Sequence, residues 1–149
     1  MRLRHRVHTS ATPAQVWTVL GDPQRWPEFD LLMHRIRGSS GPAASGQHLL
    51  GIGRGAGLRI PVDVVEAVPE QRLVLRVHAL PGVVEQITHE IRPAPRGGSD
   101  LIVSVVVEGL FARAAVAPLW LAGGLTSRVL AGRVERIARA SRRAAEGAA

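Results

Sequence analysis

The sequence predicts an α+β fold in which a seven-stranded antiparallel sheet is combined with two short helices and one long C-terminal helix. Six β-branched runs between residues 31 and 109 are separated by short turns, as in an antiparallel meander. A proline-broken stretch precedes these runs, and a segment rich in Ala, Leu and Arg follows them. The chain has 149 residues, a usual length for one domain, so we expect a single domain over residues 1–146 and a frayed tail at 147–149.

The first predicted strand covers residues 2–9, where side chains alternate with the period of two that a β-strand requires. We take the side that is mainly apolar as the concave, inward side of the sheet. That side carries Leu3, His5 and Val7, and the opposite side carries Arg2, Arg4, Arg6 and His8.

The two short helices are predicted within residues 12–30, which hold two of the chain's three tryptophans and three of its prolines. Thr12, the proline after it and Gln15 match the start of a capping box, and Gly21 ends this first helix. A second aspartate–proline pair begins at Asp22, and a further proline limits the second helix to about one turn.

Six further strands are predicted from β-branched runs that end at Gly, Pro, Ser or Asp. They cover residues 31–38, 46–55, 58–68, 71–79, 83–93 and 100–109. Alternation along the last four strands assigns a mostly aliphatic inward side. Its members are Ile60, Val62, Val64, Leu73, Leu75, Val77, Glu85, Ile87, His89, Ile91, Leu101, Val103, Val105 and Val107.

The last element is predicted as one long helix over residues 112–147. Its inward face is expected to carry Leu130, Val134, Ile137 and Ser141. Pro118 and the glycine pair at 123–124 should weaken the first half of this helix. The large indole of Trp120 lies in that half, and we therefore expect it to face an internal cavity or the mouth of that cavity.

Composition excludes several classes of site. The chain has no cysteine, which excludes disulfides, thiolate nucleophiles and cysteine-based zinc sites. No His-x-x-x-His pair or carboxylate cluster is visible, so we expect no metal and no cofactor. The N-terminus lacks the apolar core of a signal peptide, and no apolar run reaches the roughly 18 residues of a membrane span. We therefore expect a cytoplasmic protein that is not integral to a membrane.

The formal charge is +7, and every basic residue is arginine or histidine because the chain contains no lysine. The arginines are dispersed along the chain, which favours solvated faces over a nucleic-acid site. Local groups occur only on the first strand and on the polar side of the last helix, at Arg133, Arg136, Arg139, Arg142 and Arg143. We expect no nucleic-acid partner.

The order of elements resembles the START-like, helix-grip superfamily known as SRPBCC. The segments that carry the resemblance are ATPAQVWTVLGDPQRWPEF, VEAVPEQRLVLRV, VEQITHEIRP and VSVVVEGL, and it covers nearly the whole chain. The resemblance implies that a curved sheet wraps around the long helix, with a cavity between them. It also implies that Trp26 and Phe29 close one end of that cavity, whereas Trp17 packs the first helix under the sheet.

The predicted ligand-binding residues are Trp26, Phe29, His89, Glu85, Trp120, Val105, Val64 and Leu75. His89 and His5 are candidate acid–base groups, because histidine titrates near neutral pH. Either histidine could instead be a core side chain bonded to a backbone carbonyl, and Glu85 could sit at the rim in water. No nucleophile constellation is visible, and the chain has no tyrosine of the kind that orients substrate in polyketide aromatase/cyclases.

Three functions follow from these expectations. The first is binding of a hydrophobic small molecule, such as a lipid, a quinone or a polyketide-like compound, in a cavity with apolar walls and few polar groups. The second is an enzyme of the polyketide cyclase or dehydratase type that uses a cavity histidine as acid or base. The third is a non-catalytic protein that contacts a membrane or a partner through its basic, Trp-bearing helix. The protein is expected to be a monomer or a homodimer.

Overall fold

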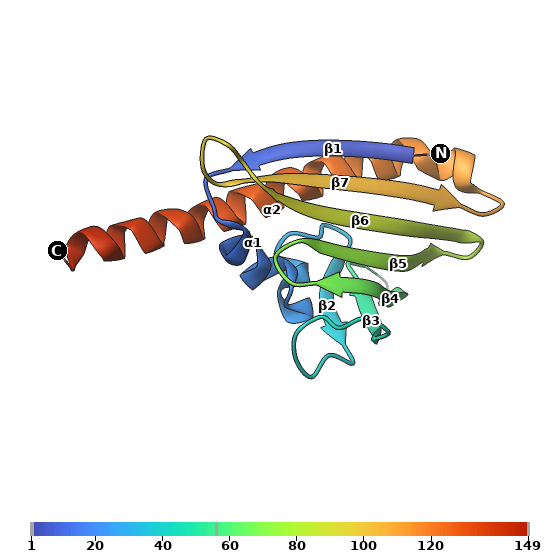
Figure 1. Ribbon diagram of the computed structural model, residues 1–149. Helices are drawn as coiled ribbons and strands as arrows, with labels where there is room; N and C mark the ends of the chain where they lie inside the picture. Colours follow the sequence, from blue (N-terminus) through green and yellow to red (C-terminus); the bar gives the residue numbers. More distant parts are fainter. Residues whose placement is uncertain (1, 56, 149) are drawn as a thin grey trace.

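The computed structural model describes residues 2–55 and 57–148, without the side chains of 113–116 and 119. Its elements follow the predicted order (Figure 1). They are β1 (Arg2–Thr9), α1 (Pro13–Leu20), the 3-10 helix η1 (Pro23–Glu28), β2 (Met33–Arg37), β3 (His48–Gly53), β4 (Arg59–Val68), β5 (Arg72–Leu80), β6 (Val83–Pro93), β7 (Ser99–Glu108) and α2 (Ala112–Gly147). The predicted fold class is confirmed.

The seven strands form one antiparallel sheet in the order β1-β7-β6-β5-β4-β3-β2. Neighbours from β2 to β7 are consecutive in the chain, as expected for strands joined by short turns. The exception is β1, which pairs with β7 so that Arg2 lies opposite Val106 and Thr9 lies opposite Ser99. The sheet is therefore completed by joining the first strand to the last.

The two short helices begin as their sequence predicts. Thr12 Oγ1 accepts a hydrogen bond from the Gln15 amide at 3.2 Å, and Gln15 Oε1 accepts one from the Thr12 amide at 3.0 Å. Gly21 is the C-cap of α1, where any side chain would collide with the indole of Trp17. Asp22 then caps η1 by accepting a hydrogen bond from the amide of Gln24 at 3.0 Å.

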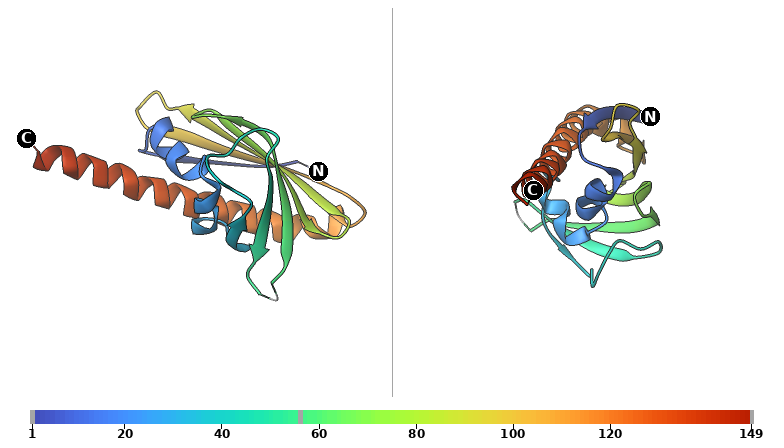
Figure 2. Two further views of the ribbon diagram at one scale, coloured as in Figure 1. Left: turned by 90° about the horizontal axis from the view of Figure 1, so that it is seen from below. Right: turned by 60° about the vertical axis from the view of Figure 1, so that its left-hand side comes forward.

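Helix α2 and both short helices lie on the concave side of the curved sheet, and the C-terminal part of α2 projects beyond the sheet (Figures 1 and 2). Leu130 and Val134 are fully buried against the sheet, as predicted, and Ile137 is half-buried. Ser141 is exposed, so its assignment to the inward face is wrong. The helical period is continuous there, but the sheet no longer lies beside the helix.

Glu135 anchors α2 to the turn that follows β1. Its carboxylate accepts hydrogen bonds from Thr9 Oγ1 at 3.0 Å, from the Ser10 amide at 2.8 Å and from Ser10 Oγ at 2.7 Å. These bonds, led by the Ser10 hydroxyl, lower the pKa of Glu135 to about 2. The anchor holds the rotation of α2 relative to the sheet, which decides which helical residues face inward.

Among the described residues, no helix combines the length and the hydropathy that a membrane crossing needs. The described part of the chain also contains no group of three or more side chains that could hold a metal ion together.

Candidate functional site

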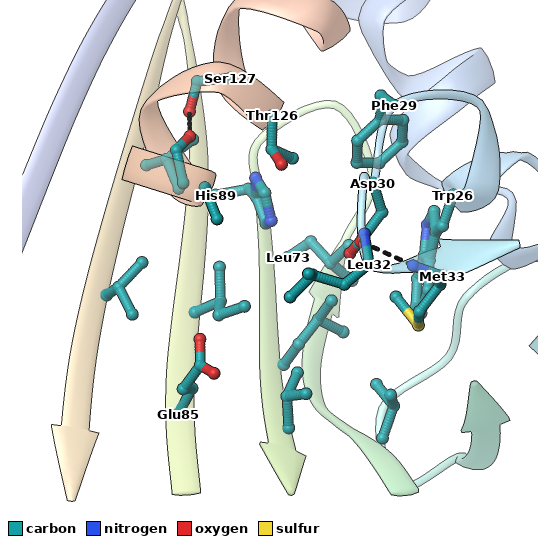
Figure 3. A pocket seen from close by; sticks show the side chains of 18 of the residues that line it. Trp26, Phe29, Asp30, Leu32, Met33, Leu73, Glu85, His89, Thr126 and Ser127 are labelled. Carbon is teal, nitrogen blue, oxygen red and sulfur yellow. Dashed lines mark hydrogen bonds between the residues drawn. The ribbon is translucent and has the colours of Figure 1, made fainter. Parts of the chain in front are cut away.

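An internal cavity lies between the sheet and α2, and its volume is about 80 Å³ (Figure 3). Strands β4 to β7 supply one wall, α2 supplies another, and η1 with the loop after it supplies a third. The lining residues are Leu20, Trp26, Phe29, Asp30, Leu32, Met33, Val62, Leu73, Leu75, Val77, Glu85, Ile87, His89, Val103, Val105, Ala122, Gly123, Thr126 and Ser127.

The sheet wall is built from aligned side chains of three neighbouring strands. Alternation along β6 turns Glu85, Ile87 and His89 inward, as predicted. The strand register places each of them between aliphatic residues of β5 and β7. His89 lies between Leu73 and Val103, Ile87 between Leu75 and Val105, and Glu85 between Val77 and Val107.

The helix wall consists of small side chains. Ala122, Gly123, Thr126 and Ser127 share one face of α2, because positions three and four apart in a helix lie above one another. The hydroxyl of Ser127 is buried and donates to the carbonyl of Gly123 at 2.7 Å. Small residues opposite the aliphatic strands leave the space that forms the cavity.

The third wall contains Trp26 and Phe29. The indole Nε1 of Trp26 donates to the carbonyl of Leu20 at 2.8 Å, and only 2% of the residue is exposed. Phe29 caps η1, with its amide bonded to the carbonyl of Trp26 at 3.1 Å. The proline-broken segment therefore places two large, buried aromatic side chains at the cavity.

Asp30 also lines the cavity, and the sequence analysis did not identify it. Its Oδ1 accepts hydrogen bonds from the amides of Leu32 at 2.7 Å and Met33 at 3.1 Å, which orients the loop into β2. Burial raises the pKa of Asp30, whereas the two amides and the positive charge of Arg54 oppose that rise. An aspartate three residues before a strand was the signal available in the sequence, because this residue type forms such local turns.

Glu85 is an unusual carboxyl group because its surroundings are apolar. Only 6% of the residue is exposed. Burial, with a smaller contribution from the negative charge of Asp30, raises the pKa of Glu85 to about 7. The side chain therefore exchanges its proton near neutral pH, and it does not sit in water at the rim.

His89 is also inward and buried, with 7% of the residue exposed. Burial lowers its pKa to about 4, so the ring is neutral at pH 7. Its Nδ1 is buried and has no hydrogen-bond partner among the described residues. This nitrogen is therefore not bonded to a backbone carbonyl, as the alternative of a core histidine would require. It is free to bond a ligand.

Glu85 and His89 do not form a directly bonded pair. Ile87 lies between them on the same face of β6, and four residues of strand span about 13 Å. Figure 3 shows both side chains projecting from this strand and Asp30 on the opposite wall. A ligand in the cavity would therefore meet separate polar groups on an apolar background.

Six of the predicted ligand-binding residues line this cavity, namely Trp26, Phe29, Glu85, His89, Leu75 and Val105. Val64 does not line it, although this residue is buried and lies opposite Leu75 in the sheet. Alternation assigns the side of a strand correctly here, but it does not tell whether a residue meets empty space or a packed neighbour.

Trp120 and His5 lie together outside the cavity. Their ring centroids are 5.7 Å apart, in a separate groove between β1 and α2, and 48% of Trp120 is exposed. At about 100° per residue, Trp120 lies about 60° from Gly123 and about 90° from the middle of the face that Ala122, Gly123, Thr126 and Ser127 form. A side chain at Gly124 would meet the His5 ring at 3.2 Å, so this glycine makes room for the histidine.

A second apolar space, which we call the outer groove, adjoins the cavity and has a volume of about 450 Å³. Leu32 lines both spaces, and 49% of this residue is exposed. The other lining residues are Gly53, Arg54, Leu58, Ile60, Ala79, Leu80, Val83, Phe111 and Pro118. Leu32 therefore lies between the cavity and the outer groove.

A curved antiparallel sheet closed on its concave side by a long C-terminal helix, with a small apolar cavity between them, defines a helix-grip protein. The chain belongs to the family described as polyketide cyclase / dehydrase and lipid transport, whose model matches residues 1–146. Family and fold are consistent with binding of a hydrophobic ligand or with a cyclase- or dehydrase-like role.

Solved structures share the fold over most of their length. A protein of Mesorhizobium loti superimposes with a TM-score of 0.75 and 16% identity, covering 91% of this chain and 98% of that one. A protein of Rhodobacter sphaeroides gives a TM-score of 0.66 and 25% identity, covering 89% and 91%. Ara h 8.0201 superimposes with a TM-score of 0.68 and 14% identity, covering 90% of this chain and 97% of that one. No curated protein matches the sequence.

Proposed function

We propose that this protein binds a hydrophobic small molecule in the cavity between the sheet and α2. The observation that carries this proposal is the cavity itself, whose walls are aliphatic and aromatic except for a few separate polar groups. Burying apolar ligand surface there would contribute about 25 cal/mol for each Å² before entropy losses.

The cavity must enlarge to hold a ligand of ordinary size. Its volume of about 80 Å³ is well below the roughly 300–1,000 Å³ of pockets that enclose drug-sized molecules. The outer groove offers the missing space, and Leu32 is the side chain shared by both. We therefore expect a ligand to displace Leu32 and to occupy the cavity and part of the groove.

A variant that fills the cavity tests this proposal. Ala122 lines the cavity, so Ala122→Leu should weaken binding of the uncharged dye N-phenyl-1-naphthylamine by about tenfold or more. Ala140→Leu adds the same side chain to the exposed part of α2 and should leave the affinity unchanged. Dye fluorescence during titration measures both. Absence of one-to-one binding to the wild type, or equal affinity in all three proteins, would contradict the proposal.

Leu32→Ala should accelerate ligand entry, because it removes the side chain between the two spaces. We expect the association rate of the same dye, measured by stopped-flow fluorescence, to rise severalfold. Leu31→Ala is the matched control, since the neighbouring Leu31 is also partly exposed but lines neither space. An unchanged rate in Leu32→Ala would show that ligands enter by another route.

The second candidate function is acid–base catalysis on the bound molecule, as in a cyclase or dehydratase. The observation that favours it is Glu85, whose pKa of about 7 suits proton transfer at neutral pH. His89 fits this role less well, because a pKa of about 4 makes it a weak base. Mass spectrometry of a compound before and after incubation with the protein distinguishes conversion from binding alone.

A further inference from the structure

The cavity differs in charge from the rest of the molecule. The protein carries a formal charge of +7, yet no arginine whose side chain the structure describes lines the cavity. The ionisable groups in that lining are two carboxyl groups, Asp30 and Glu85, and the neutral imidazole of His89. Within the cavity itself, a ligand therefore meets acidic groups and no cationic side chain among those that the structure describes, whereas Arg54 lines the outer groove.

Asp30 has bonding capacity left for a ligand. Both backbone amides that donate to Asp30 bond to its Oδ1. No described residue donates a hydrogen bond to its Oδ2. Arg54, whose positive charge acts on Asp30, lies in the outer groove, where it donates to the carbonyl of Pro27 at 3.4 Å. Within the cavity, the Asp30 carboxylate thus lacks a cationic partner among the described residues.

The other polar groups of the cavity are also suited to accept hydrogen bonds from a donor on the ligand. Glu85 accepts hydrogen bonds when it is ionised, and burial of its charge without a partner is unfavourable. The unpaired Nδ1 of His89 can accept a hydrogen bond in one tautomer of the neutral ring. A positive nitrogen of a ligand would form charge-assisted hydrogen bonds with an ionised carboxylate. His89, about 13 Å along the strand from Glu85, would accept from a separate donor group of the same ligand.

We propose that the cavity selects apolar amines, whose cationic nitrogen lies between Asp30 and Glu85, and that it excludes apolar carboxylates, sulfonates and phosphates. An anionic head group would be desolvated beside like charges, which is unfavourable in an apolar cavity. This inference rests on the proposed function, because it specifies the ligand of the same cavity. It also means that the strongly basic surface is no guide to the ligand's charge.

Three compounds with one ring system test the inference, namely 1-naphthylmethylamine, 1-naphthalenemethanol and 1-naphthoic acid. At pH 7 they present a cation, a neutral hydroxyl and an anion on the same apolar scaffold. Isothermal titration calorimetry should give the highest affinity for the amine and the lowest for the acid, with a ratio of about tenfold or more.

Variants then assign the selectivity to the two carboxyl groups. Asp30→Asn and Glu85→Gln should each reduce the amine-to-acid affinity ratio, because each removes a negative charge and keeps the size of the side chain. Asp63→Asn removes one charge from β4 outside the cavity and should leave the ratio unchanged. Glu85→Gln keeps the test valid if Asp30→Asn fails to fold.

The outcomes separate the two proposals. Tighter binding of the acid than of the amine, or a ratio that neither cavity variant alters, would overturn the selectivity for amines and leave the binding function intact. Failure of all three compounds and of the uncharged dye to bind would overturn the binding function itself.

Discussion

Replacing Trp26 with alanine should lower the free energy of unfolding by about 3–5 kcal/mol, as for other buried aromatic residues. The indole is almost fully buried, and its loss also leaves the Leu20 carbonyl without its 2.8 Å hydrogen bond. Trp26→Phe keeps most of the ring volume and should lose about 1–3 kcal/mol through that carbonyl. Urea unfolding followed by circular dichroism measures both changes.

Trp120→Ala is the matched control, because it removes the same side chain from a half-exposed position. We expect a loss of about 1 kcal/mol, the ordinary effect of a substitution with little core packing. Equal losses for Trp26→Ala and Trp120→Ala would contradict the assignment of Trp26 to the buried wall of the cavity.

Glu85→Gln should stabilise the protein at pH 8 by about 3 kcal/mol and have little effect at pH 4.5. The pKa of Glu85 rises from 4.5 to about 7 on folding, so the folded state holds its proton where the unfolded state has lost it. The contribution of Glu85 to the free energy of unfolding is therefore fully present below pH 4.5 and is lost as pH rises through 7. At about 1.4 kcal/mol for each pKa unit, the loss above pH 7 amounts to roughly 3–4 kcal/mol.

His89 should show the opposite dependence on pH. Its pKa falls from 6.5 to about 4 on folding, so its contribution is complete above pH 6.5 and is lost as pH falls toward 4. The slopes from Glu85 and His89 oppose one another between about pH 4.5 and 6.5 in the wild type. Comparing urea midpoints of the wild type, Glu85→Gln and His89→Gln across this range separates them. The absence of any gain at pH 8 in Glu85→Gln would contradict a buried, desolvated carboxyl group.

The gain in stability expected for Glu85→Gln at neutral and higher pH bears on function. A natural residue that costs stability at neutral pH is more easily explained by a role in the cavity than by a role in folding. Asp30 is comparable, because burial raises its pKa while only local backbone amides and Arg54 compensate.

Most of the secondary structure could be predicted because its causes are local. The capping box of Thr12 and Gln15 involves residues three positions apart, and the structure contains both of its hydrogen bonds. The inward side of β6 depends on alternation within one strand, and Glu85 and His89 lie on the predicted side. The sequence by itself therefore determined the order of the elements, their approximate limits and the inward face of the central strands.

Which residues line the cavity was decided by the tertiary structure. Asp30 and Glu85 are far apart in the chain and line one space only because η1 and β6 are brought together around it. The rotation of α2 placed Trp120 beside His5 and turned Ala122 and Gly123 toward the strands instead. Val64 is inward but packed, whereas Leu75 opposite it meets the cavity. Periodicity assigns a side chain to a face, but whether that face meets space, a helix or solvent depends on contacts between distant segments.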